Sequence, residues 1–166
     1  MGIKTRVCQV FFVATMMGAM PALASESSVL QKPAGTVLVE QIVEDMQQGR
    51  MRVEHYLFPF WLDHYWIQDA ETLQLLFAEG AKQRPFPVIE KLRVEIHPLT
   101  LLEHKSPRAW EQLSAKASPE FLSQTRLALV FFDIQTPEAQ KKNEESWLLV
   151  QQDAQGAWRL TGLLER

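Results

Sequence analysis

The sequence has almost no cysteine. Among its 166 residues only Cys8 carries a thiol, and Cys8 lies in an apolar run near the N-terminus. The rest of the chain therefore has no thiolate to offer as a nucleophile or a metal ligand, and no disulfide bond can stabilise it. Its stability has to come from a hydrophobic core.

The motifs of common metal and hydrolytic sites are missing as well. The four histidines are not spaced as zinc ligands, and there is no His-Glu-x-x-His motif, no Gly-x-Ser-x-Gly motif and no glycine-rich phosphate loop. We therefore expect no metal and no cofactor, and the common hydrolase classes are disfavoured. His64 is interpreted as a turn residue and His97 as a residue on the wet face of a strand.

An excess of positive charge is also absent. The chain has 17 basic and 20 acidic residues, with a net charge of −3 and no basic stripe. This balance argues against nucleic-acid binding. Beyond the N-terminal region no apolar run has the length of a membrane span, so we expect none in the mature chain.

The N-terminus has the pattern of a secretory signal peptide. Lys4 and Arg6 precede an apolar run over 7–20, and Ala22-Leu23-Ala24 provides small residues for cleavage after Ala24. We predict a signal peptide over 1–24, a flexible leader over 25–35 and one domain over 36–166. The mature chain of about 140 residues suffices for one core. The expected location is the periplasm, with secretion as the alternative.

The first predicted helix begins at a Thr36 cap and ends near Gln48, before Gly49. One face of this helix is apolar, and we interpret the opposite, polar face as solvated. The apolar face holds Val39, Ile42, Val43 and Met46, and the polar face holds Glu40, Glu44, Asp45 and Gln48.

The stretch over 59–77, PFWLDHYWIQDAETLQLLF, is the densest in structural signals. Its pattern predicts a strand over 58–62, a turn at Asp63-His64, a strand over 65–67 and a helix from Ala70 capped by Asp69. We expect this helix to bury one stripe and to end at the prolines that follow. The stripe is Leu73, Leu76, Phe77 and Ala81, and the prolines are Pro85 and Pro87.

The second half of the chain is mostly predicted strand. Alternation over 91–97 predicts a strand with one wet face, which could resume after Pro98 through Leu101 and Leu102. Ser106-Pro107 and Ser118-Pro119 are helix-start signals. The last segments predict a central strand, a polar loop and two further strands of an antiparallel meander, at 126–134, 137–145, 147–151 and 158–164.

This order of elements resembles the NTF2-like (SnoaL-like, cystatin-like cone) superfamily. Two stretches carry the resemblance: the one over 59–77, and SWLLVQQDAQGAWRLTGLLE over 146–165, which is similar to the family's closing hairpin. The helix-like insertion over 105–125 departs from many members. The resemblance implies an α+β fold, a curved antiparallel sheet packed against N-terminal helices as a cone with a pocket. It also implies functions that range from isomerases, cyclases and dehydratases to non-catalytic binding modules, so the fold alone does not decide between them.

Two hypotheses for function follow. In the first, the protein is a binding or assembly module, because its aromatic surplus could line an apolar pocket or a partner surface at Trp61, Tyr65 and Trp66. In the second, it is an acid–base enzyme on a small hydrophobic substrate. The candidate acids and bases of the second hypothesis are Tyr56, Asp63, Tyr65 and Asp133.

The aromatic cluster also has a structural interpretation, in which it fills the core. Strand alternation cannot place Phe58, Phe60 and Leu62 on the same side as Trp61. The outer aromatic face should therefore be covered by a helix, a second copy of the chain or another protein. A homodimer through the sheet is a third hypothesis.

Overall fold

The structure is a computed structural model that describes residues 34–83, 88–135 and 141–164. The predicted signal peptide and nearly all of the predicted leader lie outside the described residues, as do Pro85 and Pro87. The first half of the described chain contains α1 (Ala34–Gln47), a 3-10 turn η1 (Val53–His55), β1 (Tyr56–Leu62), β2 (Tyr65–Ile67), α2 (Ala70–Gln83) and β3 (Val88–Pro98). The second half contains α3 (Leu101–Lys105), α4 (Pro107–Ser114), α5 (Pro119–Gln124), β4 (Arg126–Gln135), β5 (Lys141–Gln152) and β6 (Trp158–Leu164).

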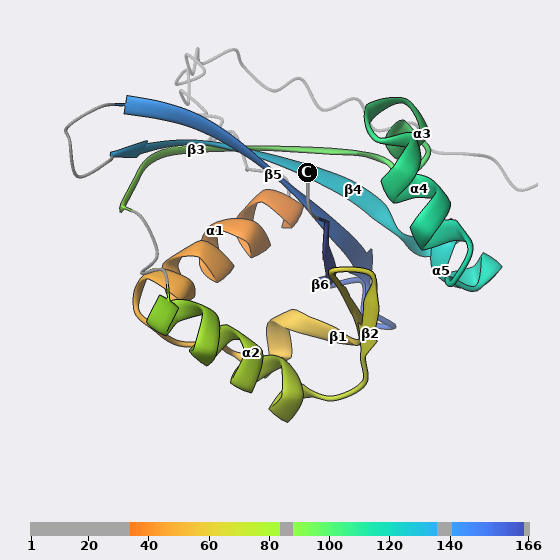
Figure 1. Cartoon of the computed structure of the whole chain (residues 1–166), viewed down its shortest axis with the longest axis horizontal. Helices are drawn as coiled ribbons and strands as arrows, with labels where there is room; N and C mark the ends of the chain where they lie inside the picture. The colour runs from red at the N-terminus through yellow and green to blue at the C-terminus, as the bar shows by residue number, and fades with distance from the viewer. Residues whose placement is uncertain (1–33, 84–87, 136–140, 165–166) are drawn as a thin grey trace, which may run out of the picture. The chain divides into compact units, whose positions relative to one another are not determined.

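The strands form one six-stranded sheet in the order β2-β1-β6-β5-β4-β3. The expected meander β4-β5-β6 is confirmed, and β3 pairs with β4, all antiparallel. One pair departs from the expected antiparallel sheet, because β1 runs parallel to β6. The predicted class, an α+β fold with a curved sheet packed against N-terminal helices, is confirmed (Figure 1).

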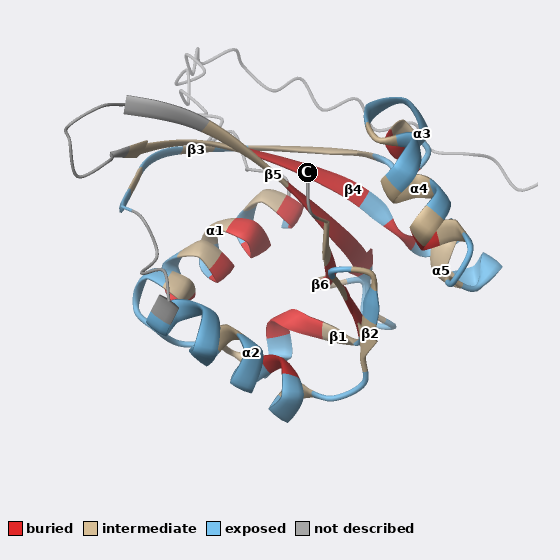
Figure 2. Ribbon diagram, viewed as in Figure 1, coloured by how far each residue is buried: buried red, intermediate tan, exposed pale blue. Residues whose placement is uncertain are grey.

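Helices cover both faces of this sheet. In Figure 1, α1 and α2 lie within the concave side of the curved sheet, whereas α3, α4 and α5 lie against its other side. Figure 2 shows the buried residues concentrated along β4, β5 and the sheet-facing side of α1, while most of α2 is exposed. The sheet therefore contributes to two hydrophobic cores.

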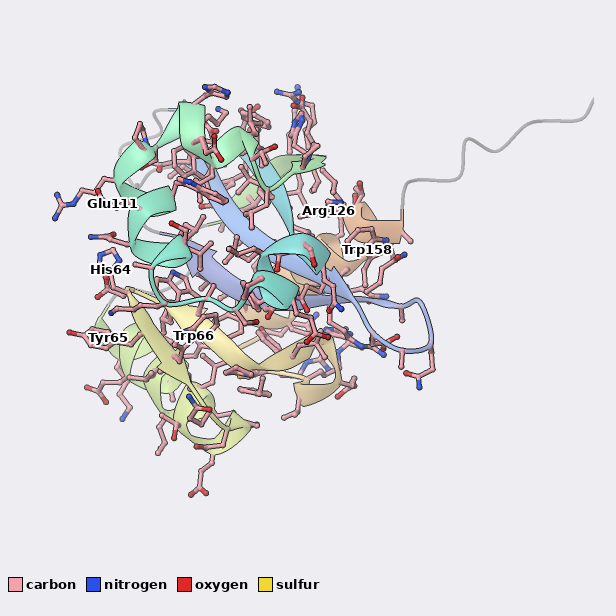
Figure 3. The ribbon with its side chains drawn as sticks, turned by 90° about the vertical axis from the view of Figure 1, so that its right-hand side faces the viewer. His64, Tyr65, Trp66, Glu111, Arg126 and Trp158 are labelled. Carbon is pink, nitrogen blue, oxygen red and sulfur yellow. The ribbon has the colours of Figure 1, made fainter. Side chains whose placement is uncertain are left out.

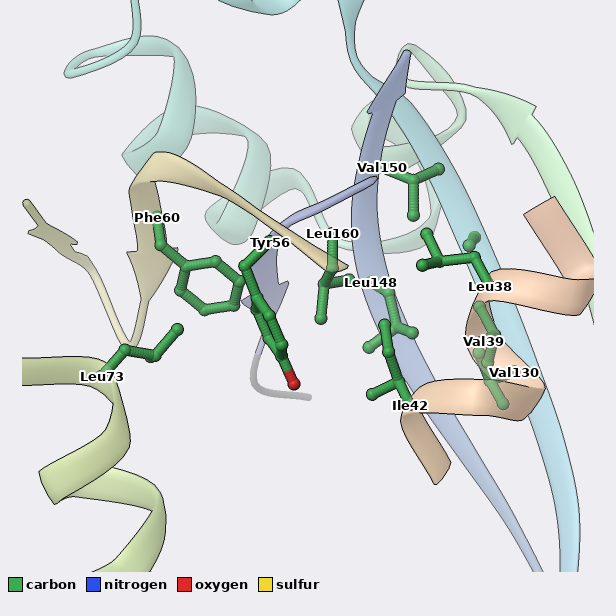
Figure 4. Close-up of a cluster of buried hydrophobic side chains, with 11 residues drawn as sticks. Leu38, Val39, Ile42, Tyr56, Phe60, Leu73, Val130, Leu148, Val150 and Leu160 are labelled. Carbon is green, nitrogen blue, oxygen red and sulfur yellow. The ribbon is translucent and has the colours of Figure 1, made fainter. Parts of the chain in front are cut away.

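The inner cluster is the core on the concave side (Figure 4). Side chains from α1, β1, α2 and the sheet interdigitate there, and the Tyr56 ring stands between Phe60 and the α1 side. Its buried members are Leu38, Val39, Ile42, Tyr56, Phe60, Leu73, Ala128, Val130, Leu148, Val150 and Leu160. Fully burying one such side chain contributes about 1.5–3 kcal/mol, so this cluster is a main source of stability.

The outer cluster is the core under α3, α4 and α5. Its buried members are Trp61, Leu99, Leu102, Leu113, Leu127, Leu129, Trp147 and Leu149. The Ser106 and Ser118 caps are confirmed, since their hydroxyls accept hydrogen bonds from the amides of Ala109 and Phe121. The side-chain nitrogen Nε2 of Gln151 donates to Thr125 Oγ1 at 2.6 Å, which ties the end of α5 to β5.

The two strands, the turn and the helix start predicted for the stretch over 59–77 are confirmed. Asp63 and His64 have φ values of 45° and 70°, so they form a tight turn between β1 and β2 although neither is glycine. The amide of Thr72 donates to Asp69 Oδ1 at 2.8 Å, which confirms the helix cap. Phe58, Phe60 and Leu62 contact the inner cluster and Trp61 the outer one, as strand alternation requires.

Two predicted element boundaries are wrong. Helix α1 begins at Ala34, two residues before the predicted Thr36 cap, and Gly35 is buried against Ile96 of β3. Strand β3 does not resume at Leu101 and Leu102. Leu99 and Leu102, three residues apart, both enter the outer cluster, which a helical turn permits and a strand would not.

The predicted polar loop over 137–145 is wrong for its second half. Residues 136–140 lie outside the described residues, but β5 begins at Lys141 and continues β4's ladder through the pairs Gln135–Lys141 to Phe131–Glu145. Backbone hydrogen bonds to β4 sustain this part of β5, so its side chains do not need to be apolar. Among the described residues, β6 pairs with β5 from Trp147 onward.

Candidate functional site

The three aromatic residues expected to bind a ligand or partner have different environments. Trp61 is 1% exposed and belongs to the outer cluster, so it is unavailable for a surface contact in this conformation. Trp66 is half-buried and packs edge-on against both Trp61 and Phe121, at ring distances of 4.9 and 5.0 Å. Tyr65 is 68% exposed and points away from the fold (Figure 3). A role of these residues in binding stays a prediction.

The outer aromatic face is covered by the chain itself. Phe121 of α5 contacts Trp66, and Leu113 of α4 is buried in the same cluster as Trp61. Lys116, which follows α4, donates to the carbonyl of His64 at 2.8 Å and lies over the Trp61 ring. A helix, a second copy of the chain or another protein was expected to cover this face. In the structure helices of the same chain cover it, and most of this helical cover comes from the insertion over 105–125.

The four candidate acid–base residues do not converge. Tyr56 is buried in the inner cluster, whereas Asp63 and Tyr65 lie at the exposed β1–β2 turn. Asp133 lies on β4, which β5 and β6 separate from β1. Burial, and next the charge of Asp45, raises the pKa of Tyr56 to about 12, so its hydroxyl stays protonated at neutral pH.

A cavity of about 420 Å³ lies between the C-terminal end of α1 and the second half of α2. This volume is in the range of small-molecule sites. Apolar side chains and glycines form most of the wall, and its polar members are Arg50 and Gln74. The lining residues are Met46, Gly49, Arg50, Met51, Gln74, Leu76, Phe77, Ala78, Gly80 and Ala81. Met46, Met51 and Phe77 also pack on the inner cluster, so the cavity borders the core.

Helix α2 is only partly packed, which is why the cavity exists. The predicted stripe is wrong in part: Leu73 is fully buried and Phe77 is half-buried, but Leu76 is 44% exposed and Ala81 is exposed as well. Leu75, outside the stripe, is 66% exposed. The helix is anchored at its first turns, and its second half covers the cavity without filling it.

A second hollow, of about 590 Å³, lies between the start of α1 and the β5–β6 turn. Its wall includes the apolar side chains of Val37 and Trp158 and the charged side chains of Glu54 and Arg159. Arg159 is already paired with Asp153 at 2.8 Å. The wall of the second hollow therefore lacks the continuous apolar surface that the first cavity has. The first cavity is the better candidate for a binding site.

The environment of Asp45 differs from the prediction. The helical pattern predicts that Asp45 lies on the solvated face of α1, but it is 1% exposed. Its carboxylate accepts hydrogen bonds from Arg52 Nε at 2.6 Å and Arg50 Nη2 at 3.2 Å, and His55 Nδ1 lies 3.5 Å away. The signal that could have revealed it is the pair of arginines that follows the helix end, because a buried carboxylate needs such partners.

These contacts set the pKa values of Asp45 and His55. Burial acts to raise the pKa of Asp45, but the hydrogen bond from Arg52 and the charges of Arg52, Arg50 and His55 together lower it from its ordinary value. Burial, followed by the charge of Arg52, lowers the pKa of His55. Asp45 is therefore a carboxylate at neutral pH and His55 is neutral. The ion pairs of Asp45 with Arg50 and Arg52 tie the segment after α1 to the helix. Among the residues that the structure describes, the buried Nδ1 atom of His55 has no hydrogen-bond partner.

Within the described ranges, no three His, Cys, Asp or Glu side chains gather in a way that could hold a metal ion. The helices of the described part of the chain are all too short or too polar to cross a membrane.

Comparisons with known proteins add one distant likeness. No protein-family model matches the sequence, and no curated protein is similar enough to count as a relative. One similar solved structure, from Xanthomonas campestris, is described as a calcium/calmodulin dependent protein kinase II association domain. It has a TM-score of 0.39 and 10% sequence identity, over 76% of this chain and 80% of that one. A likeness this distant says nothing about function.

The positions of Trp61 and Tyr65 predict opposite effects of truncation. Trp61→Ala should lower the free energy of unfolding by about 3–5 kcal/mol, because it empties a closed part of the outer cluster. Tyr65→Ala should change it by less than about 1 kcal/mol, because the residue is 68% exposed and the Lys116 ammonium over its ring is a surface contact. Urea unfolding followed by tryptophan fluorescence and circular dichroism measures both. Equal losses would show that the assignment of Trp61 to the core and Tyr65 to the surface is incorrect.

The Asp45 group predicts a specific pH dependence. Because folding lowers the pKa of Asp45, its contribution is fully present above the ordinary pKa of 3.8 and is lost as the pH falls through the lower native pKa. Asp45→Asn should cost about 1–3 kcal/mol at pH 7, since it weakens hydrogen bonds to a buried charged group. Its deficit relative to wild type should shrink at pH 3. Glu44→Gln on the same helix is the control, and a deficit independent of pH would contradict the argument.

Proposed function

We propose that the protein is an exported, non-catalytic binding module of the NTF2-like type that holds a small apolar ligand in the cavity between α1 and α2. The observation that carries the proposal is the cavity itself: about 420 Å³, with a mostly apolar wall that is continuous with the inner cluster. An apolar ligand would complete the packing that α2 leaves open, and burial of apolar surface would provide the binding free energy.

Other features support this proposal over its alternatives. The part of the sheet's outer face that carries Trp61 is covered by α3, α4 and α5, which leaves less sheet surface for a partner than the sequence suggested. Among the described residues of the cavity wall, Arg50 is the one with an ionisable side chain, and an arginine does not serve as a general acid or base at neutral pH. The proposed location is the periplasm, which rests on the signal-peptide pattern over 1–24.

The order of elements supports the superfamily assignment. Two helices on the concave side of a curved sheet, a short hairpin before α2 and a closing meander are the features that the resemblance led us to expect. The resemblance implies a pocket between helices and sheet, whereas the cavity of this chain lies between the two helices, and no strand residue is among its lining residues.

An uncharged fluorescent probe, N-phenyl-1-naphthylamine, tests the proposal. The wild-type protein should bind it with an increase in emission. Ala81→Phe, which adds a large side chain to the cavity wall, should weaken binding about tenfold, a loss of about 1.4 kcal/mol.

The matched control is Leu75→Phe, because Leu75 lies on the same helix, is exposed and does not line the cavity. This variant should bind the probe as the wild type does. Absence of probe binding by the wild type, or equal weakening in both variants, would overturn the proposal.

A further inference from the structure

Among the described residues, one charged residue lines the cavity. This residue is Arg50, and its side chain is 57% exposed, so Arg50 borders both the cavity and water. The ten lining residues include no carboxylate. A ligand with an apolar body and an anionic end would therefore meet a complementary charge at the place where the cavity meets solvent.

The backbone around Arg50 is fixed by the way α1 ends. Gly49 has a φ of 65°, the Gly49 amide donates to the Met46 carbonyl at 3.1 Å, and the Arg50 amide donates to the Asp45 carbonyl at 2.8 Å. This pair of hydrogen bonds is the Schellman motif, in which a glycine with positive φ reverses the chain after a helix. Arg50 is thereby held at the end of α1, beside Met46 and Met51 of the cavity wall.

The side chain of Arg50 has hydrogen-bonding capacity to spare. A guanidinium group has five N–H donors, and within the described part of the chain Arg50 Nη2 donates one hydrogen bond, to Asp45 Oδ1 at 3.2 Å. Arg52 Nε makes the shorter bond to the other carboxylate oxygen, at 2.6 Å. Because Arg52 already neutralises Asp45, Arg50 can face an incoming anion without leaving a buried carboxylate unpaired.

The surrounding groups agree with this assignment. Asp45 interacts with Arg50 and with the neutral His55. The charges of Glu44 and Glu54 act on Arg52, and neither glutamate lines the cavity. Gln74 of α2 adds an amide to the wall, and its N–H groups can donate to an anionic oxygen. Two methionines provide an adaptable apolar surface that suits a flexible chain.

We propose that the ligand is a single-chain amphiphile with an anionic end, of the alkyl carboxylate class, whose chain fills the cavity and whose carboxylate pairs with Arg50. This inference rests on the proposed function, since it requires that the cavity binds a ligand. Arg50 is a specificity-determining residue in this account, and it has no role in chemistry.

Titration calorimetry with decanoate and 1-decanol at pH 7 tests the inference. The wild type should bind decanoate about tenfold more tightly than 1-decanol, because a charge-assisted pair adds to the same apolar contacts. Arg50→Gln should abolish that preference and leave the affinity for 1-decanol unchanged. Arg108→Gln, which removes an exposed arginine of α4, is the matched control and should behave as the wild type.

The possible failures are distinguishable. Equal affinities of the wild type for the two compounds, or a preference that persists in Arg50→Gln, would overturn the role of Arg50 while leaving the apolar cavity as a binding site. If neither compound nor the uncharged probe bound, the proposed function itself would fall. Binding to vesicles of anionic phosphatidylglycerol without binding to monomeric decanoate would also overturn the inference, since a membrane surface would then be the target.

Discussion

The structure depends on one constraint, which is that a sheet with apolar side chains on both faces has to be covered on both faces. Strand β1 shows it most directly, because Phe60 enters the inner cluster and its neighbour Trp61 enters the outer cluster. The same alternation continues in β4, where Leu127 and Leu129 face one way and Ala128 and Val130 the other. The two helical layers follow from this requirement.

The two covers differ in how completely they pack. On the outer face, α3 and α4 each bury a leucine in the cluster that holds two tryptophans, and α5 adds partly buried side chains. Gln151 and Thr125 add a buried polar tie. On the inner face, α1 packs closely, whereas Leu73 is the one fully buried residue among those of α2 whose burial is described. Incomplete packing at this one place creates the cavity, so the candidate site is a consequence of how the fold distributes its apolar residues.

The local signals in the sequence were enough for much of the fold. The Asp63-His64 turn, the Asp69 cap and the two Ser-Pro starts each depend on a few adjacent residues, and the structure confirms them. The start of β5 could not be predicted, because its polar residues are held by backbone pairing to β4. That pairing joins β4, which has a clear strand pattern, to a segment whose own side chains carry none.

The candidate site was harder to predict than the fold. The burial of Asp45 depends on Arg50 and Arg52 folding back onto the end of α1, which helical periodicity does not show. The exposure of Leu76 and Ala81 depends on where α2 sits over the core rather than on its own pattern. A cavity arises between elements, so neither helix contains a motif that identifies it. The aromatic surplus was visible in the sequence, but most of it fills the core.

Hydrogen–deuterium exchange of α2 tests the central claim most directly. The account predicts that amides of the second half of α2 exchange much faster than those of β4 and β5 in the free protein, because little packing protects them. Adding decanoate should slow exchange in this half of the helix and leave the outer helices α3 to α5 unchanged. If α2 were as protected as the central strands without ligand, or if decanoate slowed only the outer helices, the account would be contradicted.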